Sequence, residues 1–200
     1  MPTTSSLTTT GDTQEQIIID SELAPTNDLE SAIVIGLDPG SYTAIVEGKN
    51  GTTGIALVEV YDLGTASLDV SGTAKLADIS SRGFVNIGDN VTIGGFIISV
   101  HATTVVVRAI GPSLSAFGIT GALQDPTLAL KDANGATLIF NDNWQDNPAQ
   151  ATELMAAGLA PTNPLESGID TTLPPGQYTA IVRGKGNTTG VAVVEVYALQ

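Results

Sequence analysis

The densest group of possible metal ligands in the sequence is the run Asn141-Asp142-Asn143-Trp144-Gln145-Asp146, which follows a second polar group, Asp132-Ala133-Asn134-Gly135. Calcium binds about six to eight hard oxygen atoms from carboxylates, amides and carbonyls on irregular loops. The run lacks the spacing of an EF-hand loop and its final glutamate. The alternative is that the same side chains form Asx turns and cap a helix. If calcium binds, the candidate ligands are Asp132, Asn134, Asn141, Asp142, Asn143 and Asp146.

Residues for catalysis are scarce. His101 is the single histidine and cysteine is absent, so the usual ligand set of a zinc site is missing. The nearest serine-bearing turn, at 111–115, lacks the Gly-x-Ser-x-Gly pattern that presents a nucleophile. Glu59 and Glu195 alternate with apolar residues, which favours ion-paired or strand-edge carboxylates over a glycosidase pair. We therefore predict that the protein is not an enzyme, and that calcium is the only cofactor to consider.

Composition and charge exclude several other functions. Of the 200 residues, only seven are Lys or Arg, they are scattered, and the net charge is −14. A nucleic-acid-binding surface needs a basic footprint, and an anionic membrane surface attracts basic segments, so neither partner is expected. The sequence contains no apolar run long enough for a membrane-spanning helix. The 22 glycines and 10 prolines, with short runs of Val, Ile and Thr, favour an all-β fold with many turns.

The strongest long-range pattern is a repeat. Residues 23–63 read LAPTNDLESAIVIGLDPGSYTAIVEGKNGTTGIALVEVYDL, and residues 159–199 read LAPTNPLESGIDTTLPPGQYTAIVRGKGNTTGVAVVEVYAL. The offset is 136 throughout without a gap, and 28 of the 41 positions are identical. Residues 75–146 occur only once. We call 23–63 the first copy, 159–199 the second copy and 75–146 the single segment.

Short strands bounded by turn residues dominate the predicted elements. A helix is predicted at 148–157, with Asn147 as its cap, Pro148 at its first position and Gly158 at its end. A shorter one is indicated after Asp12, because Glu15 completes a capping box. The Asn134-Gly135 pair predicts a hairpin, and Gly94-Gly95 predicts a bulge or a close backbone approach. Strands are expected in the single segment at 76–80, 83–87, 90–99, 103–110, 126–132 and 136–142, and in the copies at 32–37, 41–48, 54–63, 168–173, 177–184 and 190–199.

These elements predict an antiparallel β-sandwich or jelly-roll module with an additional half-module at its N-terminal side. The complete module covers 76–200, a size suited to one sandwich. The half-module covers 12–63 and repeats 146–199. Residues 1–11 are predicted to be a flexible tail and 64–75 a linker.

A resemblance rests on PTLALKDANGATLIFNDNW (126–144), LPPGQYTAIVRG (173–184) and the closing GVAVVEVYAL (190–199). These runs resemble the tandem β-sandwich modules of large bacterial cell-surface proteins and, more loosely, the pre-peptidase C-terminal domains of secreted enzymes. The resemblance covers about 76–199, and again 23–63 for the half copy. It implies an exported, non-catalytic module, and therefore an extracellular or cell-surface location.

The additional half-module directs the functional hypothesis. Where the second copy and its preceding helix carry Glu153 and Asp170, the first carries Ile17 and Val34, so we predict an apolar interface whose residues are Ile17, Ile19, Val34 and Ile35. A half-sandwich also leaves backbone groups unpaired at a sheet edge. We therefore expect self-association into a dimer or a surface filament. One alternative is a calcium-dependent adhesion or carbohydrate-binding module that recognises surface glycans. Another is a fragment of a longer tandem-repeat surface protein.

Overall fold

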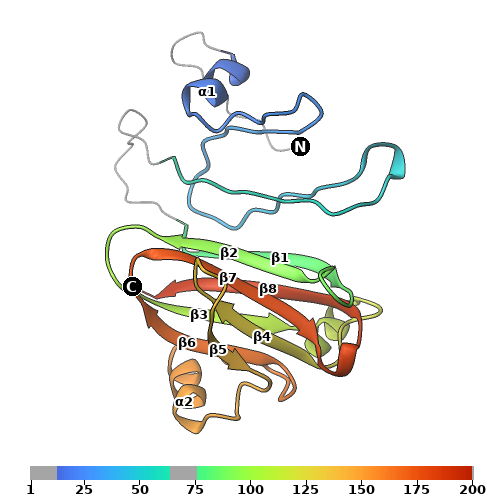
Figure 1. Cartoon of the computed structure of the whole chain (residues 1–200), viewed down its shortest axis with the longest axis vertical. Helices are drawn as coiled ribbons and strands as arrows, with labels where there is room; N and C mark the ends of the chain where they lie inside the picture. Colours follow the sequence, from blue (N-terminus) through green and yellow to red (C-terminus); the bar gives the residue numbers. More distant parts are fainter. Residues whose placement is uncertain (1–12, 64–75, 200) are drawn as a thin grey trace. The chain divides into compact units, whose positions relative to one another are not determined.

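A computed structural model describes residues 13–63 and 76–199 of the chain (Figure 1). The chain divides into two units, Met1–Lys75 and Leu76–Gln200, and each is described by itself. The predicted tail at 1–11, the capping residue Asp12 and the predicted linker at 64–75 lie outside the described residues.

The second unit is a sandwich of two antiparallel four-stranded sheets, as the sequence predicts (Figure 1). One sheet has the order β1-β8-β3-β6 and the other the order β2-β7-β4-β5. The strands are β1 (Asp78–Val85), β2 (Thr92–Ile98), β3 (Thr103–Ile110), β4 (Pro126–Lys131), β5 (Thr137–Asn141), β6 (Ser167–Leu173), β7 (Gly176–Gly184) and β8 (Gly190–Leu199).

Alternation of apolar and polar residues builds the core between the sheets. Strand β8 alternates buried and half-buried positions along most of its length, and β4 does the same. Gly94 lies where the sheets approach closely, because a Cβ atom there would sit 3.1 Å from a methyl group of Val194. The buried core residues are Val85, Ile98, Val105, Val107, Ala109, Leu123, Leu128, Leu130, Ile169, Leu173, Tyr178, Ala180, Val182, Ala192, Val194 and Val196.

The strand pairing follows a simple rule. Within the single segment, β4 pairs with β5. Every other ladder of the described sandwich joins a single-segment strand to a second-copy strand: β1 to β8, β2 to β7, β3 to β6, β3 to β8 and β4 to β7. Strands β6, β7 and β8 therefore form no ladder with one another. The second copy supplies a central strand to each sheet, and neither sheet is continuous without it.

Helix α2 (Pro148–Ala156) covers the outer side of the first sheet, near β6 (Figure 1). Its predicted cap is confirmed, since the Asn147 side chain accepts hydrogen bonds from the N–H groups of Ala149 and Gln150. Trp144 is buried with Val106 and two α2 residues, Ala151 and Leu154, in a second apolar cluster. Short 3₁₀ helices, η2 (Pro112–Phe117) and η3 (Lys185–Asn187), complete this unit.

The first unit contains helix α1 (Gln14–Asp20) and the 3₁₀ helix η1 (Lys49–Gly51), but residues 13–63 form no β-strand. The predicted strands at 32–37, 41–48 and 54–63 are therefore wrong, although their second-copy equivalents match β6, β7 and β8 within one residue. The pairing rule explains the difference, because these strands form only against the single segment. The cap of α1 is Thr13, whose hydroxyl accepts from the N–H of Gln16.

One other prediction needs correction. The predicted strands 76–80 and 83–87 form one strand, β1. No turn interrupts it, because Arg82 and Gly83 continue the ladder opposite Val193 and Ala192. None of the helices in the described residues has the length and hydropathy that a membrane crossing requires.

Candidate functional site

A fully buried side chain of the second copy, that of Glu166, contacts the single segment. Its Oε1 atom accepts hydrogen bonds from the backbone N–H groups of Gly111 (3.1 Å) and Ser113 (3.0 Å) and from the Ser113 hydroxyl. Its Oε2 atom accepts from the N–H of Asn163 at 3.3 Å. A buried carboxylate is tolerated only with such a set of donors, so Glu166 ties the second copy to the start of η2.

A second anchor surrounds Arg108, which lies on β3 in the single segment. Its guanidinium group forms an ion pair with Glu195 at 2.7 Å and donates to the hydroxyl of Tyr197 (2.9 Å) and the carbonyl of Leu159 (2.9 Å). The guanidinium carbon also lies 5.0 Å from the centre of the Tyr197 ring. Burial, and then the charge of Glu195, raise the pKa of Tyr197. Of the two predicted roles of Glu195, ion pair or strand-edge carboxylate, the structure shows the ion pair, and its partner is an arginine of the single segment.

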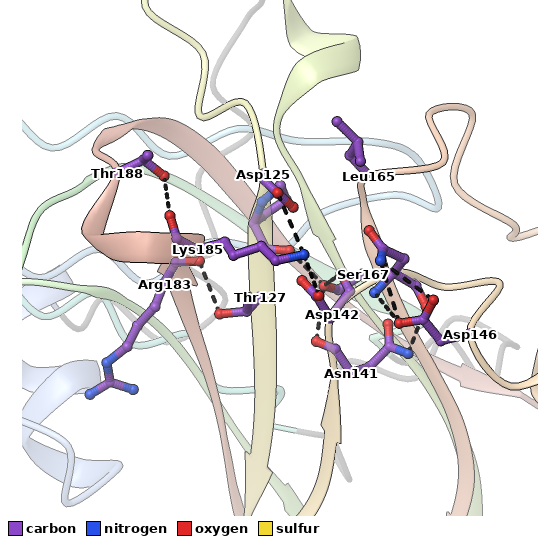
Figure 2. A network of polar contacts seen from close by, with 12 residues as sticks. Asp125, Thr127, Asn141, Asp142, Asp146, Leu165, Ser167, Arg183, Lys185 and Thr188 are labelled. Atoms are coloured by element: carbon purple, nitrogen blue, oxygen red, sulfur yellow. Dashed lines mark hydrogen bonds and ion pairs between the residues drawn. The ribbon is translucent and has the colours of Figure 1, made fainter.

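Lys185 forms a third anchor at the end of β7 (Figure 2). Its ammonium group lies 2.6 Å from the Asp142 carboxylate and 3.8 Å from that of Asp125, and its backbone N–H donates to the Asp125 carbonyl. The hydrogen bond with Asp142 raises the pKa of Lys185, as do the charges of Asp125, Asp142 and Asp146, while burial opposes them. Nearby, the Ser167 hydroxyl donates to carbonyl oxygens of the single segment.

The six candidate calcium ligands lie in two groups, with β5 between them. Asp132 stays in the β4–β5 hairpin, where its carboxylate accepts from the N–H groups of Asn134 and Ala136. The other four begin at the last residue of β5, Asn141, and continue beyond it; Asn141 accepts from the N–H of Gly168 and Asp146 accepts from Asn143. A strand rises about 3.3 Å per residue, so about 13 Å or more of β5 separates the groups. One ion cannot contact both.

The group beyond β5 has features of its own. The oxygen atoms Oδ1 of Asp125, Asp142 and Asn143 are buried without a hydrogen-bond partner. Of these three residues, Asp142 lines a surface depression of about 280 Å³, together with Asp146 and Phe140 among others. Across the ranges 13–63 and 76–199, no cluster of three or more His, Cys, Asp or Glu residues is arranged to hold a metal ion.

The first copy retains all the side chains with which the second copy enters the core. The eight core residues of the second copy have identical counterparts at the 136-residue offset. In the first copy these side chains are exposed: Ile33 is 78% exposed where Ile169 is fully buried, and Leu37 is 50% exposed where Leu173 is 5% exposed. The retained counterparts are Ile33, Leu37, Tyr42, Ala44, Val46, Ala56, Val58 and Val60.

The polar anchors are retained as well. Glu30, Lys49, Glu59 and Tyr61 correspond to Glu166, Lys185, Glu195 and Tyr197. In the first copy all four are exposed. The Tyr61 hydroxyl donates to Glu59 at 3.1 Å, whereas in the second copy both partners bind Arg108. That hydrogen bond raises the pKa of Tyr61.

The first copy also keeps the local turns of the second. The Tyr42 hydroxyl donates to the carbonyl of Asp38 at 2.8 Å, as Tyr178 donates to Pro174 at 2.8 Å. The side chain of Gln14 on α1 donates to the carbonyl of Val34, matching the bond from Gln150 on α2 to Asp170. The two copies therefore share local conformation and differ in their sheet partners.

The predicted interface residues lie on and near α1. Ile17 and Val34 are half-buried, whereas Ile19 (49%) and Ile35 (47%) are about half exposed. Ile17 and Val34 correspond to Glu153 on α2 and Asp170 on β6. These two residues lie close enough for the charge of Glu153, after burial, to raise the pKa of Asp170. Sequence analysis did not single out the exposed core counterparts, although an identical apolar set in both copies was the signal that could have revealed them.

Comparison with known proteins adds little to this description. No family model matches the sequence, and no curated protein matches it. Among solved structures, a pre-peptidase C-terminal domain of a collagenase from Bacillus anthracis matches with 14% identity and a TM-score of 0.37, over 60% of this chain and 88% of that one. The predicted likeness to tandem surface modules remains a prediction.

Proposed function

We propose that this protein is a non-catalytic structural protein of the cell exterior that self-associates through its first copy, as a subunit of a surface filament. One observation carries the proposal: the side chains that form the sandwich core in the second copy are exposed in the first. A folded monomeric protein rarely leaves a whole set of core-type side chains exposed without using them in an interface.

The magnitude of the effect supports association. Full burial of one Val, Leu or Ile side chain stabilises by about 1.5–3 kcal/mol. The first copy presents five such residues from the core set, together with Tyr42. Its turns are already in the second-copy conformation, which lowers the entropic cost of docking.

The form of the assembly depends on how the contacts are arranged. Two first copies that pack their apolar surfaces on each other produce a dimer, whereas a contact between unlike surfaces that does not close produces a filament. The extracellular location belongs to the same proposal and rests on the resemblance to surface modules.

Deletion of residues 1–63 tests the proposed role of the first copy. The sandwich has its own core, so the deleted protein is expected to remain folded and to become monomeric, while the full chain forms larger species by light scattering and negative-stain electron microscopy. Deletion of residues 1–11 alone is the matched control and should leave assembly unchanged. Equal sizes for the full chain and the 1–63 deletion would refute the proposal.

A second candidate function is calcium-dependent adhesion or glycan binding at the residues beyond β5. The buried Oδ1 atoms of Asp125, Asp142 and Asn143 favour it, because they lack partners in a site of the hard-oxygen chemistry that calcium prefers. Lys185 opposes it, since its ammonium group already neutralises Asp142.

Calorimetric titration of the full chain with calcium, and then with glycans, tests this second candidate function. Binding that disappears in Asp142→Asn and strengthens in Lys185→Met would support the site. Absence of calcium heat in both the full chain and Lys185→Met would remove this candidate.

A further inference from the structure

We infer that the partner of the first copy is a polypeptide segment of the same type as the single segment, a β1–β5 lobe that lacks its closing strands, and that the first copy completes it by donating three strands. The inference rests on the proposed role of the first copy as an association segment, and it names what that segment binds. Strand donation of this kind supplies backbone hydrogen bonds for affinity and side-chain pockets for specificity.

The positions of the differences between the copies are the first support. Thirteen of the 41 aligned positions differ, and 13 second-copy positions are buried. An even spread would place roughly four differences at buried positions, whereas only Gly168 is both buried and changed. The first copy has therefore changed on the surface that faces away from a lobe and has kept the surface that faces one.

The polar anchors are the second support, because apolar packing alone does not require them. Glu166 is useful only where backbone N–H groups receive it, and Glu195 and Tyr197 only where an arginine lies between them. The first copy retains the counterparts of all three, Glu30, Glu59 and Tyr61, without such partners. Two first copies packed on each other would supply no arginine, since the first copy contains none.

Stoichiometry limits the kind of lobe that the first copy can close. Residues 1–200 contain one single segment and two copies, and the second copy already fills the lobe. Exchange between chains releases one copy for each copy that docks, so it leaves the number of unpaired copies unchanged. Self-association by such exchange is therefore possible but neutral in the number of closed lobes, and a net gain in buried surface comes from a lobe that has no closing segment of its own.

Position 32 is the third support. The second copy has Gly168 there, and a Cβ atom would lie 2.8 Å from Leu154 Cδ1 and 3.2 Å from Trp144 Cβ. Of these two neighbours Trp144 belongs to the lobe and Leu154 to α2. The first copy has Ala32, so beside Trp144 it fits this chain's own lobe less well than the second copy does. A mismatch of this kind disfavours competition within the chain and favours a different lobe.

Introduced cysteine pairs test the inference on the full chain, which has no cysteine of its own. Arg82 on β1 lies opposite Val193 on β8, and the first-copy counterpart of Val193 is Leu57. Opposite residues of antiparallel strands lie about 4.5–5.5 Å apart at Cα, within disulfide range. Arg82→Cys with Val193→Cys reports the second copy in the β8 position, and Arg82→Cys with Leu57→Cys reports the first copy there.

This chain's own lobe serves as the probe once the second copy is weakened by Glu166→Ala and Ile169→Asp. In the unaltered background we expect the 82–193 disulfide and little of the 82–57 disulfide. In the weakened background, with Ala32→Gly to remove the mismatch, the 82–57 disulfide should rise by on the order of tenfold or more. The matched control adds Glu30→Ala and Ile33→Asp to the first copy and should abolish it. Non-reducing gels distinguish links within a chain from links between chains, and either supports the inference.

Failure of the 82–57 disulfide to rise in the weakened Ala32→Gly background would overturn the inference, provided that the 82–193 disulfide forms in the unaltered chain. Trp144, the single tryptophan, gives an independent readout, because second-copy residues such as Leu159 and Tyr197 pack against its buried cluster in the closed sandwich. Assembly of the unaltered chain is measured separately by light scattering. Loss of self-association therefore contradicts the proposed function alone, and loss of the 82–57 disulfide contradicts this inference alone.

Discussion

The two copies are identical at 28 of 41 positions, yet only one of them forms strands in the described residues. The second copy supplies β6, β7 and β8, and the first supplies none in the described residues. Their turns agree, so the difference does not originate in local conformational preference. It originates in the ladders of β6, β7 and β8, all of which join the second copy to the single segment. In this fold a sequence with strand propensity forms a strand only where a partner strand is available.

The largest expected difference between the copies concerns the buried glutamate. We expect Glu166→Ala to lower the free energy of unfolding of the sandwich by about 3–5 kcal/mol, because the N–H groups of Gly111 and Ser113 lose their acceptor. The equivalent Glu30→Ala should change it by less than about 0.5 kcal/mol. Urea unfolding followed by Trp144 fluorescence measures both. Equal losses would mean that the first copy already occupies a lobe, and would contradict the difference between the two copies.

An apolar pair extends the comparison to packing. Ile169→Ala should cost about 2–5 kcal/mol, since Ile169 is fully buried between the sheets. Ile33→Ala should leave the unfolding free energy of the sandwich unchanged, because Ile33 is 78% exposed. Urea midpoints at constant slope give both values. A cost at Ile33 close to that at Ile169 would show that the first copy is packed in solution.

Sequence reasoning predicted the sandwich because its signals are local. Alternation marked β6 to β8, and Asn147, Pro148 and Gly158 marked the ends of α2. The same signals failed for the first copy, since periodicity reports which side chains could be buried and says nothing about whether a partner strand exists. They also divided β1 in two, because Arg82 and Gly83 resemble a turn when the opposite strand is unknown.

The candidate site was less accessible from sequence for a related reason. The contacts of Glu166 with residues 111–113, and of Arg108 with Glu195, span 53 and 87 residues. The calcium hypothesis grouped residues by nearness in sequence, and β5 separates them in space. Sequence proximity identified turns correctly, and long-range anchors could be found only by asking why both copies keep the same charged residues.

A smaller effect is expected at Gly168. Gly168→Ala introduces into the second copy the residue that the first copy carries, and its Cβ atom would crowd Leu154 and Trp144. We expect a loss of about 1–3 kcal/mol in unfolding free energy, accompanied by a change in Trp144 emission. The reverse change, Ala32→Gly, should leave both quantities unaltered. An unchanged stability in Gly168→Ala would remove the mismatch from the reasons why the first copy prefers another lobe.

The smallest expected effect concerns Asp170, the strand residue that the first copy replaces with Val34. Burial, and then the charge of Glu153, raise the pKa of Asp170 above 3.8. The folded state therefore holds this proton more tightly than the unfolded state, so the stabilisation is present at low pH and is lost as the pH rises through the folded-state pKa. Asp170→Val removes this loss of stability with rising pH. The thermal midpoint of the variant should therefore exceed that of the unaltered protein by more at pH 7 than at pH 3. Asp170→Asn is the control for charge without apolar gain and should share the pH dependence. Because β6 is an edge strand, Asp170 also places a charge where another chain could pair. A gain in thermal midpoint that is larger at pH 7 than at pH 3 would show that this charge matters. A gain that is independent of pH would assign the Asp-to-Val difference between the copies to apolar packing alone.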